Sequence, residues 1–177
     1  MITAQSKFKE VSFMKFYEDL EQALQNLTSR GAFLTVKGSD GTVNTMTISW
    51  GYIGYSWNKP YFVALVRPSR YTHELIETAD SYTISIPYDD EMGKALSICG
   101  SKSGRDVNKE ELANIKFIPS QEVSAPIVDH CNMYYECKIT YTDQIQVDQL
   151  PDELRKKNYN GDYHDMYYGE IVKTYKK

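Results

Sequence analysis

Cysteine and histidine are scarce in this chain, and their scarcity limits the chemistry that it can carry. Three cysteines and three histidines occur among its 177 residues. The odd cysteine count and the lack of a C-x-x-C pair argue against a disulfide scaffold and a structural zinc site, so we expect no metal. Cys131 and Cys137 share one face of an expected strand, where about 20 Å of strand rise separates them. We therefore expect both as buried free thiols.

Blocks of like charge and long apolar runs are also missing. The net charge is −4, without any run of five or six like charges, so the chain lacks the basic stripe of a duplex nucleic-acid binder. A local basic pocket for a small anion remains compatible with this balance. The longest apolar run, near residues 61–66, is far shorter than a membrane span. The first 16 residues lack the apolar core of a signal peptide, and we expect a cytoplasmic protein.

The pattern along the chain predicts a single domain over residues 1–177, with residues 1–30 as an N-terminal helical extension. Strands dominate and helices occur at irregular places, unlike the steady alternation of a doubly wound sheet. We therefore predict a mainly β fold with peripheral helices, arranged as a closed or split barrel. The first expected helix covers residues 13–27 and is ended by Gly31. Thr72 is expected to cap a second, short helix, a third covers 89–100, and Asn108 is expected to cap a fourth. A helical turn is expected at 151–157. The expected strands cover 32–50 as a hairpin, 61–66, 81–87, 115–118, 131–142 and 168–175, with 51–61 as a loop.

The segment "NTMTISW", residues 44–50, is an uncharged stretch within the hairpin. If it is extended, alternate side chains point to opposite sides. One face then carries Asn44, Met46, Ile48 and Trp50, and the other carries the hydroxyls of Thr45, Thr47 and Ser49. Such a hydroxyl row fits a solvated edge strand. It also fits a flat polar ligand that approaches the backbone closely.

The segment "RPSRYT", residues 67–72, follows a continuous apolar strand. We expect that strand to deliver Arg67, Ser69 and Arg70 to the first turn of a helix, where free N–H groups and the helix dipole favour anions. Guanidinium groups add charge-assisted hydrogen bonds to phosphate oxygens. The segment therefore fits a cradle for a phosphomonoester. Two surface arginines beside a capped helix are the alternative.

Two further segments could contribute to a site. The loop "GSKSGRD", residues 100–106, is rich in donors around Lys102 but lacks the spacing of a nucleoside triphosphate loop. His164 precedes the last strand among Tyr163, Tyr167 and Tyr168, as either a packed residue or an acid–base. A ligand that is flat, forms hydrogen bonds along one edge and is phosphorylated at the end of a chain fits these features together. FMN has that shape, and pyridoxal phosphate is the smaller competitor, with Lys102 as its only placeable Schiff-base lysine.

The residues 30–77, "RGAFLTVKGSDGTVNTMTISWGYIGYSWNKPYFVALVRPSRYTHELIE", followed by "ALSICGSKSGRD", closely resemble the flavin reductase-like family. These proteins are FMN-binding split barrels, and the closest likeness is to the flavoredoxin branch. The resemblance implies a homodimer with FMN near the subunit interface. It implies an isoalloxazine ring against residues 44–50, with main-chain and hydroxyl groups of Thr45, Thr47 and Ser49 near its polar edge. Around the phosphate it implies contacts with Arg67, Ser69, Arg70, Tyr71 and Thr72. The loop residues Ser101, Lys102 and Ser103 would flank the cofactor.

The same resemblance implies a role for His164, because reductases of this family carry a histidine five residues before a Gly-Glu or Gly-Arg pair. Here that pair is Gly169 and Glu170. The implied function is an FMN-binding oxidoreductase that reduces flavin at the expense of NAD(P)H, with His164 as the candidate catalytic residue. A non-catalytic FMN electron carrier between protein partners is the alternative. A barrel that binds another phosphorylated ligand without redox chemistry is a more distant third.

Overall fold

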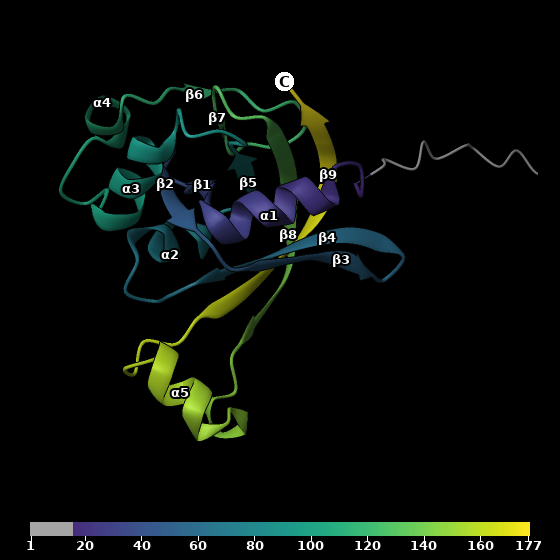
Figure 1. Ribbon diagram of the computed structural model, residues 1–177, viewed down its shortest axis with the longest axis vertical. Helices are drawn as coiled ribbons and strands as arrows, with labels where there is room; N and C mark the ends of the chain where they lie inside the picture. The colour runs from purple at the N-terminus through teal and green to yellow at the C-terminus, as the bar shows by residue number, and fades with distance from the viewer. Residues whose placement is uncertain (1–15) are drawn as a thin grey trace, which may run out of the picture.

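The computed structural model describes residues 16–177, and strands make up most of its regular structure (Figure 1). Within that range the helices are α1 (Leu20–Ser29), α2 (Tyr71–Ile76), α3 (Gly93–Ser101), α4 (Lys109–Ala113) and α5 (Asp152–Asn158), with a 3-10 turn at Val147–Gln149. The strands are β1 (Ala32–Lys37), β2 (Val43–Ile48), β3 (Gly51–Ser56), β4 (Lys59–Val66), β5 (Ser81–Ile86), β6 (Phe117–Ile118), β7 (Ile127–Val128), β8 (Met133–Gln144) and β9 (Asp165–Lys176). No helix in this part of the chain has the length and apolar character needed to cross a membrane.

Seven strands form one antiparallel sheet in the order β2-β1-β5-β8-β9-β4-β3. The sheet does not close, so β2 and β3 are its two edges although they follow one another in the chain. This arrangement confirms the predicted mainly β split barrel with peripheral helices. The short strands β6 and β7 pair separately.

The main buried cluster joins the strands of this sheet to α1. Ala23 and Leu27 of α1 are buried in the main cluster with Phe62, Tyr82 and Tyr135. Helix α1 therefore contributes side chains to the core. A second cluster packs Phe33 and Tyr134 against α3, α4 and β7.

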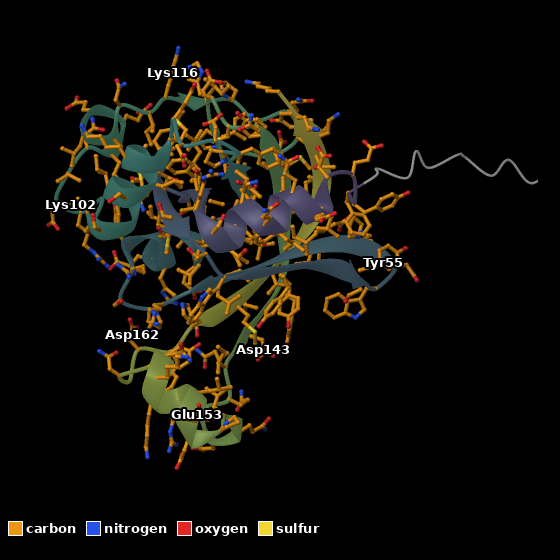
Figure 2. All side chains as sticks on the ribbon, viewed as in Figure 1. Tyr55, Lys102, Lys116, Asp143, Glu153 and Asp162 are labelled. Carbon is orange, nitrogen blue, oxygen red and sulfur yellow. The ribbon has the colours of Figure 1, made fainter. Side chains whose placement is uncertain are left out.

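Residues 145–164, which we call the arm, leave the sheet between β8 and β9 and carry α5. Figure 1 shows the arm projecting from the body, and Figure 2 shows Glu153 at its far part and Asp162 where it returns. The flanking strands pair up to Gln144 and Asp165. The arm is therefore held by two chain connections and by contacts at its base.

The loop predicted at residues 51–61 is wrong, because this segment forms the β3–β4 hairpin. Its two-residue turn is Trp57–Asn58, with φ of 49° and 60°. Positive φ at both central residues is the type I′ pattern that matches the twist of paired strands. The strand was missed because β3 is an exposed edge with glycines and aromatics on both faces, and so lacks an apolar alternation.

Helix boundaries also differ from the prediction. Thr72 is not the N-cap of α2, since Arg70 occupies that position and Thr72 is buried inside the first turn. Helix α3 begins at Gly93 instead of the aspartates and runs through Gly100. Asn108 does cap α4, where its side-chain oxygen accepts from the backbone N–H groups of Glu110 and Glu111. The expected helical position Phe13 lies outside the described residues.

All three cysteines are free and buried, which confirms the prediction made for Cys131 and Cys137. Burial raises the pKa of the Cys99 thiol to about 11. It also raises the pKa of Cys131 and of Cys137 far above the ordinary value. The thiols are therefore protonated and act as small apolar core residues.

Candidate functional site

Two adjoining hollows open where β2 and β4 end. The first, which we call the tryptophan hollow, has a volume of about 150 Å³ and is lined by Met46, Thr47, Ile48, Ser49, Trp50, Leu65, Arg67, Arg70 and His164. The second, the cationic hollow, has about 110 Å³ and is lined by Asn44, Met46, Ser69, Arg70, Tyr71, Thr72, residues 99–105 and Lys109. Met46 and Arg70 line both. Every residue that the sequence singled out for the site lies in one of these walls, except Thr45.

The side chain of Thr45 is buried and points into the protein. Its hydroxyl accepts a hydrogen bond from Thr35 Oγ1 at 2.9 Å and donates to the Leu34 carbonyl at 3.2 Å. The hydroxyl of Thr47 likewise donates to the Leu96 carbonyl of α3 at 2.6 Å. The hydroxyls of Thr45 and Thr47 are therefore engaged within the protein, by β1 and by α3 respectively. Ser49 is exposed, just beyond the end of β2.

The arm engages two residues of the predicted phosphate cradle. Arg67 donates to the carbonyls of Asp162 at 2.7 Å and Asn158 at 2.9 Å, and its guanidinium lies 5.1 Å from the centre of the Tyr159 ring. Ser69 donates its hydroxyl to the Asp162 carboxylate at 2.6 Å. These bonds fix the base of the arm against the end of β4. They also commit much of the donor capacity of Arg67 to the protein itself.

Arg70 is the arginine left available to a ligand. It is exposed and lines both hollows, and its guanidinium makes no hydrogen bond or ion pair with any residue in the range 16–177. Helix α2, which follows it, has only six residues. The attraction for anions therefore comes from the charged side chains of the hollow.

The polar wall behind Arg70 is held by Asn44 and Thr72. The Asn44 amide donates to the Thr72 hydroxyl at 2.8 Å, and both side chains are buried. A Cβ added to Gly104 would lie 2.1 Å from Asn44 Oδ1. Only glycine at this position lets the 101–105 loop approach that closely.

Lys109 is the residue that sequence reasoning missed. Its side chain is buried, with 6 % exposed, and its ammonium donates to the carbonyls of Thr45 at 2.6 Å and Cys99 at 3.1 Å. Desolvation lowers the pKa of Lys109, and the nearby charge of Arg70 lowers it further. Among the described residues no carboxylate pairs with it. A buried ammonium with only neutral acceptors is costly, and an anion in the hollow would offset that cost.

The cationic hollow combines four basic residues, Arg70, Lys102, Arg105 and Lys109. Arg105 is partly neutralised by Glu74, with which it forms an ion pair, and it lies over the Tyr71 ring. Lys102 is exposed at the end of α3, and Figure 2 shows it at the outer edge of the molecule. The hollow is therefore positive and open on one side.

His164 lies in the wall of the tryptophan hollow with 8 % of its surface exposed. Its neighbours are Trp50, with 5.1 Å between ring centres, and Tyr159, whose hydroxyl is 3.1 Å from Nδ1. The tyrosines adjacent in sequence make other contacts. Burial, with help from the charge of Arg67, lowers the pKa of His164 to about 4. The imidazole is therefore neutral near pH 7.

The β9 strand that follows His164 is tied to α2 by a second histidine. His73 Nε2 lies 2.7 Å from the Asp165 carboxylate. This contact joins α2, the helix that follows the cradle, to Asp165, the residue next to His164. It helps to hold the two sides of the tryptophan hollow in register.

Comparison with known proteins identifies the family of this chain. Residues 24–177 match the model of the flavin reductase like domain. An uncharacterized protein of Archaeoglobus fulgidus is 26 % identical over 149 residues, which cover 84 % of this chain and 73 % of that protein.

Solved structures share the fold. The flavoredoxin of Desulfovibrio vulgaris (Miyazaki F) superposes with a TM-score of 0.66 at 22 % identity, over 83 % of this chain and 69 % of that one. An FMN-binding protein of Thermus thermophilus gives a TM-score of 0.61 at 23 % identity, over 82 % of this chain and 69 % of that one. Since the family match spans most of the sequence, this chain belongs to the flavin reductase like domain family.

Proposed function

We propose that this protein binds FMN, with the phosphate in the cationic hollow and the isoalloxazine ring in the tryptophan hollow along residues 46–50. The observation that carries the proposal is the buried ammonium of Lys109, which lacks a carboxylate partner among the described residues and lines a hollow with three further basic residues. A phosphomonoester is the kind of anion that such a group of cations binds. The name of the Thermus relative, an FMN-binding protein, supports the same ligand.

The arrangement of the two hollows supports a long ligand with different ends. They meet at Met46 and Arg70, so one molecule can extend from the cations to the aromatic wall. Trp50 and the backbone of residues 47–49 offer the ring a flat surface with polar main-chain groups. Lys102, the candidate Schiff-base lysine of a pyridoxal phosphate site, lies exposed at the end of α3. That position favours the larger flavin.

The reaction that we propose is the oxidation of NAD(P)H. Bound FMN would supply a ring that takes up and releases electrons and hydride equivalents. The part of the protein is to hold that ring, to balance negative charge with Arg70 and Lys109, and to control protons. His164 is neutral near pH 7, and its hydrogen bond to the Tyr159 hydroxyl orients the imidazole in the wall of the tryptophan hollow. We propose His164 as the acid–base residue of the site.

An electron carrier that passes electrons between protein partners is the second candidate function. The structural likeness to a flavoredoxin favours it. The same hollows would hold FMN in either case. A homodimer is part of both proposals, and the exposed Tyr52, Tyr55 and Trp57 of the β3–β4 hairpin give it an aromatic contact surface.

The test is the colour of the purified protein and its anaerobic response to NADH and NADPH. A yellow protein that either nucleotide bleaches supports the reductase. A yellow protein that neither bleaches supports the carrier. A colourless protein that cannot be reconstituted with FMN removes both, and leaves another phosphorylated ligand for the cationic hollow.

A further inference from the structure

A third cavity, of about 430 Å³, lies between α1, the β2–β3 corner and the arm. Leu24 and Leu27 of α1 form one wall, and Leu150 and Leu154 of the arm form the opposite wall. Its size falls within the usual range of small-molecule sites. We call it the apolar cavity.

The chemistry of this cavity is opposite to that of the cationic hollow. Among the residues that line it none is charged, and its exposed surface is mostly apolar. Trp50, Tyr52 and Tyr159 give it flat aromatic faces, which favour stacking with planar molecules. A nucleotide with its phosphates would leave its charges unpaired there. The cavity therefore selects against NAD(P)H and for an uncharged molecule.

The cavity also adjoins the tryptophan hollow. Ser49, Trp50 and Leu65 line both. Tyr159 is part of the cavity wall, and its hydroxyl meets His164 of the hollow at 3.1 Å. A molecule in the cavity would thus lie next to the proposed ring position, beside a tyrosine that is hydrogen-bonded to a neutral histidine.

We propose that the apolar cavity binds a flat, uncharged, carbonyl-bearing molecule of the quinone class as the electron acceptor. This inference rests on the proposed function, and it names the acceptor that the hollows alone do not define. Conversion of a quinone to its hydroquinone takes up two electrons and two protons. NAD(P)H supplies the electrons and one proton as a hydride equivalent, and water supplies the second proton.

The test compares two exposed leucines on short helices. Leu154 of α5 lines the cavity and is 49 % exposed, whereas Leu112 of α4 is 46 % exposed and lines none of the three cavities. The variants Leu154→Arg and Leu112→Arg add the same charged side chain at the two places. Binding of 2,3-dimethyl-1,4-naphthoquinone, whose blocked ring positions prevent thiol addition, is measured by equilibrium dialysis with and without FMN. FMN affinity is measured separately by titration.

We expect FMN to bind equally to all three proteins, and the quinone to bind at least tenfold more weakly to Leu154→Arg than to the parent or to Leu112→Arg. Equal quinone binding by all three, or none by the parent, overturns the proposal. So does conversion of a dimer to a monomer by Leu154→Arg alone in sedimentation, because a second copy would then occupy the cavity. If the parent does not bind FMN, the proposed function is refuted. Quinone binding to the FMN-free protein then still tests whether the apolar cavity binds a quinone.

Discussion

The carboxylate of Asp162 accepts hydrogen bonds from both the hydroxyl and the backbone N–H of Ser69, at 2.6 and 3.3 Å. The arm thereby places a negative charge next to Ser69, a hydrogen-bond donor of the predicted phosphate cradle. Asp162 is close enough to the site to act on the pKa of His164. The contact links the position of the arm to the charge beside the cofactor site.

Replacing Asp162 with Asn should strengthen FMN binding relative to riboflavin. The amide keeps an acceptor for Ser69 but removes the negative charge, so phosphate binding should improve by about 0.5–1 kcal/mol, the scale of a partly exposed charge interaction. Titration of both flavins measures the ratio. The matched control is Asp152→Asn, which removes a carboxylate of the same arm that pairs with Arg155. An equal change in both variants would assign the effect to net charge alone.

Lys109→Met should weaken FMN binding by about 1.5–3 kcal/mol, the usual worth of a hydrogen bond to a charged group. Lys102→Met removes an exposed charge from the same hollow and should cost less than about 1 kcal/mol. Riboflavin should bind almost unchanged in both, since it lacks the phosphate. Thermal unfolding of each variant checks the fold, because the Thr45 and Cys99 carbonyls lose their donor. Similar losses for riboflavin and FMN in Lys109→Met would show that the lysine only supports the wall.

The two arginines of the cradle should behave differently. Arg70→Ala should reduce FMN affinity but leave the arm unchanged, since this guanidinium has no bonded partner within residues 16–177. Arg67→Ala removes the hydrogen bonds to Asn158 and Asp162, so the backbone amides at 158–164 should exchange faster with deuterium. Hydrogen-exchange mass spectrometry with a parallel FMN titration measures both effects. Identical profiles for the two variants would contradict this division of roles.

The low pKa of His164 gives a prediction for stability against pH. The folded protein holds this pKa at about 4, below the ordinary value of 6.5. Between these values the unfolded chain binds more protons, so the free energy of unfolding should rise from pH 4 to pH 6.5 and flatten above. The contribution is roughly 3 kcal/mol at most, from about 1.4 kcal/mol per pKa unit. Urea unfolding of the parent and His164→Asn should show a shallower acid limb in the variant, and parallel limbs would refute the assignment.

Gly104→Ala should disturb the polar wall behind Arg70. The new Cβ would meet Asn44 Oδ1 at 2.1 Å and Tyr71 Cδ1 at 3.1 Å, so the loop or the Asn44–Thr72 pair must move. Overpacking of this kind costs about 1–3 kcal/mol. Gly54→Ala is the control, because its Cβ meets nothing within 4 Å. Thermal unfolding and FMN titration should separate the two, and a neutral Gly104→Ala would mean that the loop is loosely held.

The site residues could be predicted from the sequence because they come from short, continuous segments. Arg67 to Thr72 follow an apolar strand directly, so their common location depends on local structure alone. The same reasoning did not reveal that the hydroxyls of Thr45 and Thr47 are used by contacts with β1 and α3. Alternation gives the face on which a side chain lies, but it does not say what packs against that face.

Lys109 and Asp162 could not be placed from the sequence for a related reason. Lys109 stands in a polar helix start, "NKEEL", where most lysines are solvated. Its burial depends on the approach of β2 and α3, which are remote in the chain. Asp162 reaches Ser69 across 93 positions. Such contacts form only when the barrel has folded, whereas the fold itself was predicted from the family motifs.

The step from β2 to β3 determines the curvature of the whole sheet. These strands are its opposite edges, and seven flat strands would separate them by about 29 Å at about 4.8 Å per interval. Yet only Ser49 and Trp50 join Ile48 to Gly51, a link that reaches about 11 Å when fully extended. The sheet must therefore curl until its edges nearly meet, and the proposed flavin site lies in the seam between them. A residue inserted between Ser49 and Trp50 would relax that tether and widen the seam, while each strand kept its own pairing.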